Sequence, residues 1–125
     1  MHQLALVCVG GALGSGARYL VALGAARWIG TEFPYGTLLV NLAGAFLIGL
    51  VQQLAAASVL SADSRLLLST GVMGGLTTYS AFSYETVRLL QLGAWRAAAI
   101  NVGVTTALCL ALSLAGMAAG RALTR

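Results

Sequence analysis

The stretch GVMGGLTTYSAFSYE, residues 71–85, decides the fold of this chain. It lies in a segment that carries no charge from Leu66 to Tyr84, which is long enough to cross a bilayer. The stretch suits a regular helix poorly, because Gly74-Gly75 gives up backbone order and Thr77-Thr78 can hydrogen-bond to its own backbone. Broken helices are tolerated at membrane depth where the freed backbone is buried in protein or lines a cavity. We therefore expect a break that binds or passes something small and charged.

The composition around this stretch is that of an all-α integral membrane protein. Of the 125 residues, 59% are hydrophobic and only 8% are charged, and the mean hydropathy is +0.91. A soluble domain would carry about one quarter charged residues. The basic residues are seven arginines, and they form neither a basic cluster nor a pattern interleaved with aromatics. The chain is therefore not expected to bind nucleic acid.

We predict four membrane spans in one transmembrane domain that covers residues 1–125. The spans lie at about residues 3–26, 37–59, 66–92 and 97–120. Trp28, Tyr35 and Trp95 flank them and are typical of an interfacial aromatic belt. The pattern Gly10-x-x-x-Gly14 places two small residues on one helical face, which favours close helix packing. The first span lacks the features of a signal peptide and is taken as part of the mature protein.

The arginines favour neither orientation in the membrane. Four spans put both termini on one side, with Arg65, Arg121 and Arg125, and leave Arg27, Arg88 and Arg96 on the other side. Arg18 lies deep in its span and is left out of this even count; including it makes the split four to three. A balanced count is what a protein needs if it inserts both ways and pairs antiparallel. The alternative is that short loops make such counts noisy. Four short helices enclose little interior, so a transport path is more plausible at a subunit interface.

Two polar residues in the first two spans are candidates for anion contact. Arg18 could attract an anion into a vestibule, or it could extend its charge to the membrane surface. Asn41 could offer two amide donors to an anion, or it could bond a neighbouring helix.

The third span adds aromatic rings and hydroxyls. Tyr79 and Phe82 share a helical face, and their positive ring edges could touch a dehydrated anion; the alternative is simple packing. Hydroxyls of Ser80 and Ser83 surround them. Glu85 is spaced to pair with Arg88 at the helix end. No catalytic set is present, so an enzyme is not expected.

Three motifs, in this order, resemble the CrcB/Fluc family of fluoride channels. They are GGALGSGARY at residues 10–19, YGTLLVNLAGAFLIG at residues 35–49 and the stretch at residues 71–85. The resemblance implies four spans with a broken third helix, assembled as an antiparallel dual-topology homodimer with two fluoride pores. It also implies a structural sodium ion at the dimer centre, where the two breaks meet.

The resemblance assigns roles residue by residue. Backbone carbonyls of Gly74 and Thr77 would hold the sodium ion, as suits a hard cation. Asn41, Tyr79 and Phe82 would line the pore, and the vestibule would contain Arg18 and Glu85. Hydroxyls of the fourth span also line the pore in this family, and the candidates here are Thr105 and Thr106. Tyr79 departs from the family's phenylalanine; the ring edge is kept and a hydroxyl is added.

The function implied is passive export of cytoplasmic fluoride through the bacterial inner membrane. Fluoride is small and strongly hydrated, so its path must replace water with amides, hydroxyls and ring edges. One alternative is a small multidrug transporter, but those proteins are expected to carry a carboxylate in the first span, where this chain has Arg18. Another is a membrane scaffold or holin-like protein, which would not explain the clustered polar break.

Overall fold

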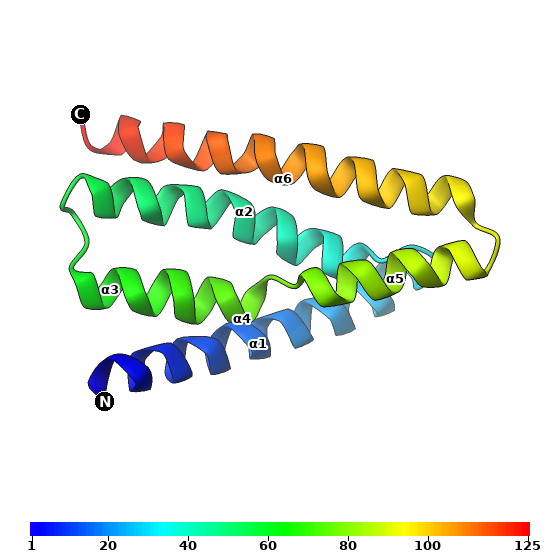
Figure 1. Cartoon of the computed structure of the whole chain (residues 1–125), viewed down its shortest axis with the longest axis horizontal. Coiled ribbons are helices and arrows are strands. Elements are labelled where there is room, and N and C mark those ends of the chain that lie inside the picture. The colour runs from blue at the N-terminus through cyan, green and yellow to red at the C-terminus, as the bar shows by residue number, and fades with distance from the viewer.

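The computed structural model describes all residues, 1–125, and every regular element is a helix (Figure 1). Three helices are long and unbroken: α1 (His2–Trp28), α2 (Tyr35–Ala56) and α6 (Trp95–Leu123). Between α2 and α6 the chain forms four consecutive pieces, namely α3 (Ala62–Leu66), the π-helix η1 (Leu67–Met73), α4 (Gly74–Leu76) and α5 (Tyr79–Gln91). The third crossing is therefore a bent and interrupted helix.

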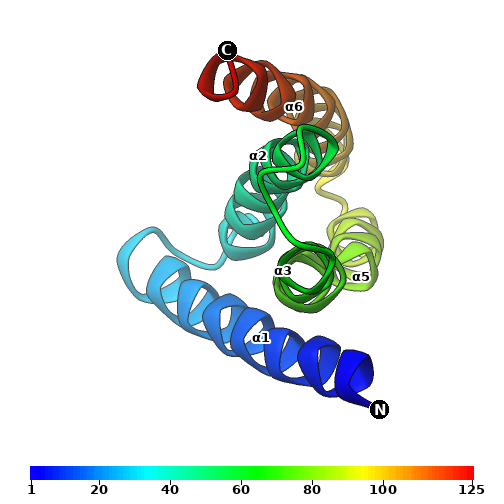
Figure 2. The ribbon, with the colours of Figure 1, turned by 90° about the vertical axis from the view of Figure 1, so that its left-hand side faces the viewer.

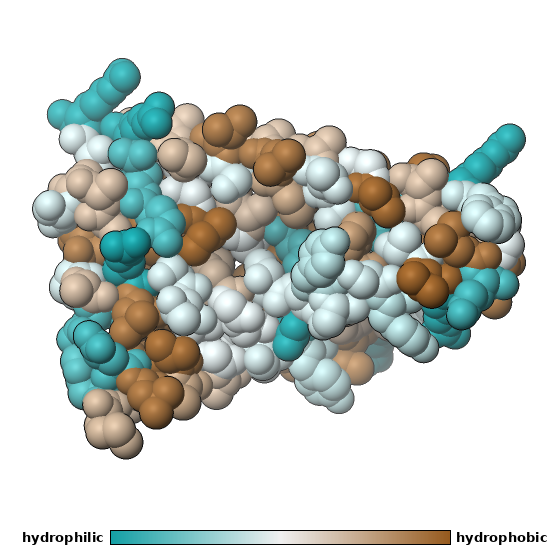
Figure 3. All heavy atoms as spheres, viewed as in Figure 1, coloured by the Kyte–Doolittle hydropathy of each residue, from teal (hydrophilic) through white to brown (hydrophobic).

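The three long helices are each apolar enough to cross a membrane. The interrupted segment runs beside them along the long axis of the molecule, and both termini lie at the same end (Figure 1). Hydrophilic residues gather mainly at the two ends of the long axis, and neutral and apolar residues fill the middle (Figure 3). Only 17 of 125 residues are buried, so the single chain has little interior of its own, as expected. This is a multi-pass membrane protein.

Seen end-on, the interrupted helix lies between α1 on one side and the pair α2 and α6 on the other (Figure 2). Glycines permit the close approach of α2 and α6. A Cβ atom on Gly116 would lie 2.9 Å from the Leu50 nitrogen, and one on Gly49 would lie 3.1 Å from the Met117 nitrogen. Small residues at such crossings let membrane helices pack backbone to backbone.

The predicted glycine face of the first span packs against the interrupted helix. A Cβ on Gly10 would lie 2.8 Å from the Gly71 Cα, and a Cβ on Gly14 would lie 2.8 Å from the Leu76 nitrogen. Gly75 meets the same helix, because its Cβ would lie 2.9 Å from the Ser15 nitrogen. Backbone contacts of α1 therefore fix where η1 and α4 lie.

The break is shorter than the sequence suggested. Gly74 and Gly75 remain helical within α4, so the expectation that the glycine pair loses helical order is wrong. Gly75 serves instead to let α1 approach. Only Thr77 (φ −80°, ψ 155°) and Thr78 (φ −152°, ψ 114°) are extended. The π-helical turns of η1 were not anticipated.

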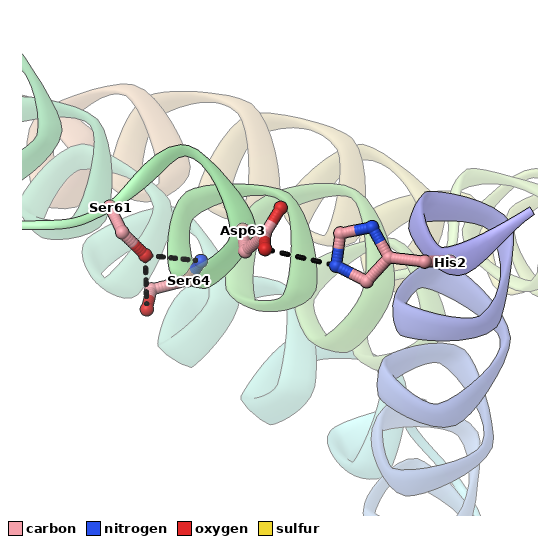
Figure 4. Close-up of polar contacts among 4 residues, drawn as sticks. All are labelled: His2, Ser61, Asp63 and Ser64. Carbon is pink, nitrogen blue, oxygen red and sulfur yellow. Dashed lines mark hydrogen bonds and ion pairs between the residues drawn. The ribbon is translucent and has the colours of Figure 1, made fainter.

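Polar contacts join α1 to α3 and cap α3 at the end of the molecule that carries the termini (Figure 4). The His2 Nε2 lies 2.9 Å from the Asp63 Oδ2, which ties the start of α1 to α3. Ser61 caps α3 by accepting a hydrogen bond from the Ser64 backbone N–H at 3.1 Å. At the opposite end, Gly93 turns the chain from α5 into α6 with φ +74°, a conformation that favours glycine.

Candidate ion pathway at the helix break

Asn41 holds the break open from the neighbouring helix α2. Its Nδ2 donates to the Thr78 carbonyl at 3.1 Å, and its Oδ1 accepts from the Thr78 N–H at 2.8 Å. One side-chain amide thus satisfies both backbone groups of a buried extended residue. Asn41 makes an interhelical bond, which was one of the two expectations for it, and it also lines a hollow described below.

The four carbonyls from Gly74 to Thr77 lose their helical partners at the break. In a continuous helix the Thr78 N–H would bond the Gly74 carbonyl, but here it donates to Asn41. The Ala81 N–H would bond the Thr77 carbonyl, but it donates to the Thr78 Oγ1 at 3.2 Å, which caps α5. The Thr77 carbonyl accepts no backbone hydrogen bond at all. Side-chain acceptors thus take the backbone donors that the Gly74 and Thr77 carbonyls would have in a helix, and the Thr77 carbonyl accepts from Arg18 instead.

Arg18 points toward the break. Its Nη1 donates to the Thr77 carbonyl at 3.4 Å, and the side chain is half-buried. The guanidinium is thus turned into the protein, where it contacts the backbone of the break.

Two hollows flank the break. The first, of about 550 Å³, lies between α2, α6 and both halves of the interrupted helix. The second, of about 630 Å³, lies between α1, the start of α2 and the start of α5. Thr78 is the only residue that lines both. The break at Thr78 therefore lies between the two hollows and borders both of them.

The first hollow collects most of the candidate pore and sodium residues, namely Asn41, Gly74, Thr77, Tyr79, Phe82, Thr105 and Thr106. The rings of Tyr79 and Phe82 lie 5.6 Å apart at an interplanar angle of 48°. Their shared face was expected from the three-residue spacing. Tyr79 is 80% exposed in the single chain, so one side of this hollow is uncovered.

The hydroxyl candidates do not all reach the same space. Thr105 is buried and Thr106 is exposed, and both line the first hollow. Ser80 lines the second hollow instead. Ser83 lines neither hollow, and its hydroxyl donates to the Tyr79 carbonyl of its own helix at 2.9 Å.

The second hollow brings the two candidate vestibule residues, Arg18 and Glu85, into one space. Glu85 does not pair with Arg88. Its Oε1 accepts from the Thr37 hydroxyl at 2.9 Å, and its Oε2 is buried without a hydrogen-bond partner. This space offers a guanidinium and hydroxyls as donors, with one carboxylate at its edge.

Three polar residues were not singled out from the sequence. Thr37 contacts Glu85 from 48 residues away, and Thr86 and Asn101 bond each other from α5 and α6. An amide in the apolar fourth span was the one available signal, since polar groups in a membrane interior are expensive. Its partners could not be known without the packing of α5 on α6.

A broken helix at mid-chain, two hollows that meet at it and freed backbone carbonyls define a class: a small multi-pass membrane protein with an ion pathway built on an interrupted helix. Within that class, the chain belongs to the CrcB-like family, described as "CrcB-like protein, Camphor Resistance (CrcB)", whose model matches residues 5–117. The family expected from the three motifs is thereby confirmed.

Curated relatives cover nearly the whole chain. The chain is 50% identical over 116 residues to the fluoride-specific ion channel FluC of Anaeromyxobacter dehalogenans, with 92% of each chain covered. It is 47% identical over 124 residues to FluC of Sorangium cellulosum, with 98% of each covered. It is 44% identical over 110 residues to FluC of Shewanella oneidensis, which covers 88% of this chain and 89% of the relative.

Proposed function

We propose that this chain is a fluoride-selective channel that lets cytoplasmic fluoride leave the cell passively through the bacterial inner membrane. The observation that carries the proposal is near-full-length identity of 44–50% to proteins named fluoride-specific ion channels. The geometry at the break gives that similarity a physical basis, because the donors an anion requires gather on both sides of Thr78.

The path we propose runs through both hollows. In the second hollow the Arg18 guanidinium attracts the anion, since a fixed positive charge in a low-dielectric recess concentrates anions. Ser80 and the second N–H of the Asn41 amide supply hydrogen-bond donors beside Thr78. In the first hollow the ring edges of Tyr79 and Phe82 replace water, because aromatic edges are positive. Donors at fixed positions favour the small fluoride ion over the larger chloride.

The working unit in this proposal is an antiparallel homodimer of dual topology. The uncovered side of the first hollow carries Tyr79, at 80% exposure, and the exposed Gly74. A second copy would close that side, and the even division of the arginines fits insertion in both orientations. Each dimer would contain two pores, one for each set of rings.

The residues at the break fit a structural sodium ion at the dimer centre. The carbonyls of Gly74 and Thr77 have lost their helical donors, and neutral oxygens of this kind suit a hard monovalent cation. The chain has no group of three or more His, Cys, Asp or Glu side chains that could hold a metal. We assign the backbone carbonyls of Gly74 and Thr77 as its ligands, as the family resemblance implies. When bound, sodium supplies a fixed positive charge beside the anion path.

The proposal is tested with purified protein in liposomes loaded with fluoride or with chloride. We expect fluoride efflux well above protein-free liposomes and much slower chloride efflux. No fluoride efflux above the protein-free control would exclude the channel. Crosslinking of single-cysteine variants tests the assembly separately, and a yield of parallel dimers alone would exclude the dual topology.

A further inference from the structure

Asn101 on α6 is buried more completely than any other polar side chain, at 1% exposure. An amide without partners in such a place would be costly, so it is kept only if its hydrogen bonds are made. It lines neither hollow, so it does not face the path proposed above. Its role must therefore be exerted through the groups that it contacts.

Asn101 stands in the middle of a hydrogen-bonded chain that joins α5 to α6. The Thr86 hydroxyl donates to the Phe82 carbonyl at 2.7 Å, and the Asn101 Nδ2 donates to the Thr86 Oγ1 at 2.9 Å. The Thr105 hydroxyl donates to the Asn101 Oδ1 at 3.4 Å. Because the Thr86 hydroxyl uses its only hydrogen to donate to the Phe82 carbonyl, it must accept from the Asn101 amide. The amide oxygen of Asn101 therefore faces Thr105.

The two ends of this hydrogen-bonded chain, Phe82 on α5 and Thr105 on α6, both line the first hollow. The helix break separates α5 from α4, and Leu89 is the only buried residue of α5. Apolar packing alone therefore gives this helix few constraints. A directed chain of hydrogen bonds through a buried amide supplies one.

We propose that Asn101 is a positioning residue for ion permeation: it sets the separation of the Phe82 ring from the Thr105 hydroxyl. The inference rests on the proposed channel function. The bond from Thr105 is the longest of the three, so its hydroxyl is the one member that can turn to an anion in the hollow at little cost. Asn101 thus fixes the position of α5 near Phe82 and leaves the Thr105 hydroxyl able to donate to an anion.

The experiment compares variants of nearly equal volume. Asn101→Leu removes both hydrogen bonds of the amide. It leaves no unpaired donor on Thr86, because the Thr86 hydroxyl still donates to the Phe82 carbonyl. Thr86→Val removes the hydroxyl at the other side of the same bond, and Thr86→Ser retains it. Thr70→Val, on an exposed threonine outside both hollows, is the matched control.

Liposome flux and amide hydrogen exchange of α5 are measured on each purified dimer. We expect Asn101→Leu and Thr86→Val each to slow fluoride efflux about tenfold, the size expected for one lost buried hydrogen bond, and to lower the preference for fluoride over chloride. The double variant should be no slower than either single one, because both changes break one chain. Thr86→Ser and Thr70→Val should stay within about twofold of the parent.

Flux and exchange separate the two claims. Folded Asn101→Leu dimers with parental efflux, selectivity and α5 exchange would overturn the positioning role, as would strictly additive effects in the double variant. If Asn101→Leu fails to fold, the comparison of Thr86→Val with Thr86→Ser decides instead. If the parent protein itself passes no fluoride, the proposed function fails, while faster α5 exchange in Thr86→Val but not in Thr86→Ser still establishes the structural part.

Discussion

The two halves of the interrupted helix are held by different means. The half before the break, η1 and α4, lies against α1 through backbone contacts that only glycine permits at Gly10, Gly14 and Gly75. The half after the break, α5, is placed by side-chain hydrogen bonds from Asn41 on α2 to Thr78 and from Asn101 on α6 to Thr86. Backbone contact cannot be adjusted by small steps, whereas a polar side chain can be exchanged for another. We infer that the first half is a fixed support and that the second half tunes permeation.

The largest effect is expected from a change in the fixed half. Gly14→Val would push side-chain atoms into the backbone of α4, since even a Cβ would lie 2.8 Å from the Leu76 nitrogen. Overpacking of this kind costs about 3 kcal/mol, a large part of typical stability. We expect little monodisperse protein on size exclusion and a strongly lowered Tm. Gly24→Val, on the same helix but facing open space, is the control and should purify normally.

Asn41→Leu should have the next largest effect, because it strips the partner from two backbone groups of Thr78. Each orphaned group costs about 1–3 kcal/mol, and the geometry of the break would relax. We expect fluoride efflux to fall about a hundredfold or more. Asn41→Asp, which can still accept from the Thr78 N–H, should retain more thermal stability than Asn41→Leu while losing efflux. A leucine variant with half the parental efflux would refute this account of the break.

Arg18→Gln should act on anion entry more than on folding. It removes the positive charge from the second hollow, so efflux at low fluoride should drop about tenfold, and the dependence on ionic strength should weaken. Arg18→Lys keeps the charge and should lose no more than about threefold. Efflux is measured over a range of fluoride and potassium gluconate concentrations. Equal losses in both variants would indicate that the contact with the Thr77 carbonyl matters more than the charge.

The smallest effect is expected from Tyr79→Phe, which restores the ring common in the family. The ring edge toward Phe82 is unchanged, and the exposed position leaves the hydroxyl free of packing constraints. We expect efflux and selectivity within about twofold of the parent, measured in the same liposomes. A gain or loss beyond about fivefold would assign the Tyr79 hydroxyl a role in the path.

Local patterns revealed the parts of the molecule that depend on nearby residues. The interruption near Thr77-Thr78, the glycine face of α1 and the shared face of Tyr79 and Phe82 could all be predicted from spacing and residue type. The glycine pair at Gly74-Gly75 was misread, because glycine can serve either unwinding or close packing and only the neighbouring helix decides which.

The remaining features depend on contacts between distant segments. Thr37 meets Glu85 across 48 residues, and Asn101 meets Thr86 across 15. A threonine or asparagine in an apolar span indicates that a hydrogen-bond partner is needed, but the sequence alone does not identify that partner.

The π-helical turns of η1 set the direction in which the break faces. Their i→i+5 bonds span one residue more than those of an α-helix, and Gly71 within η1 and Gly75 after it both meet α1, while Gly74 faces open space. Removing one residue from η1 would turn everything before it by about 100° relative to the break. The number of residues in this segment therefore sets the direction of the Gly74 carbonyl, and deleting one η1 residue that lines neither hollow, such as Thr70, would change that direction.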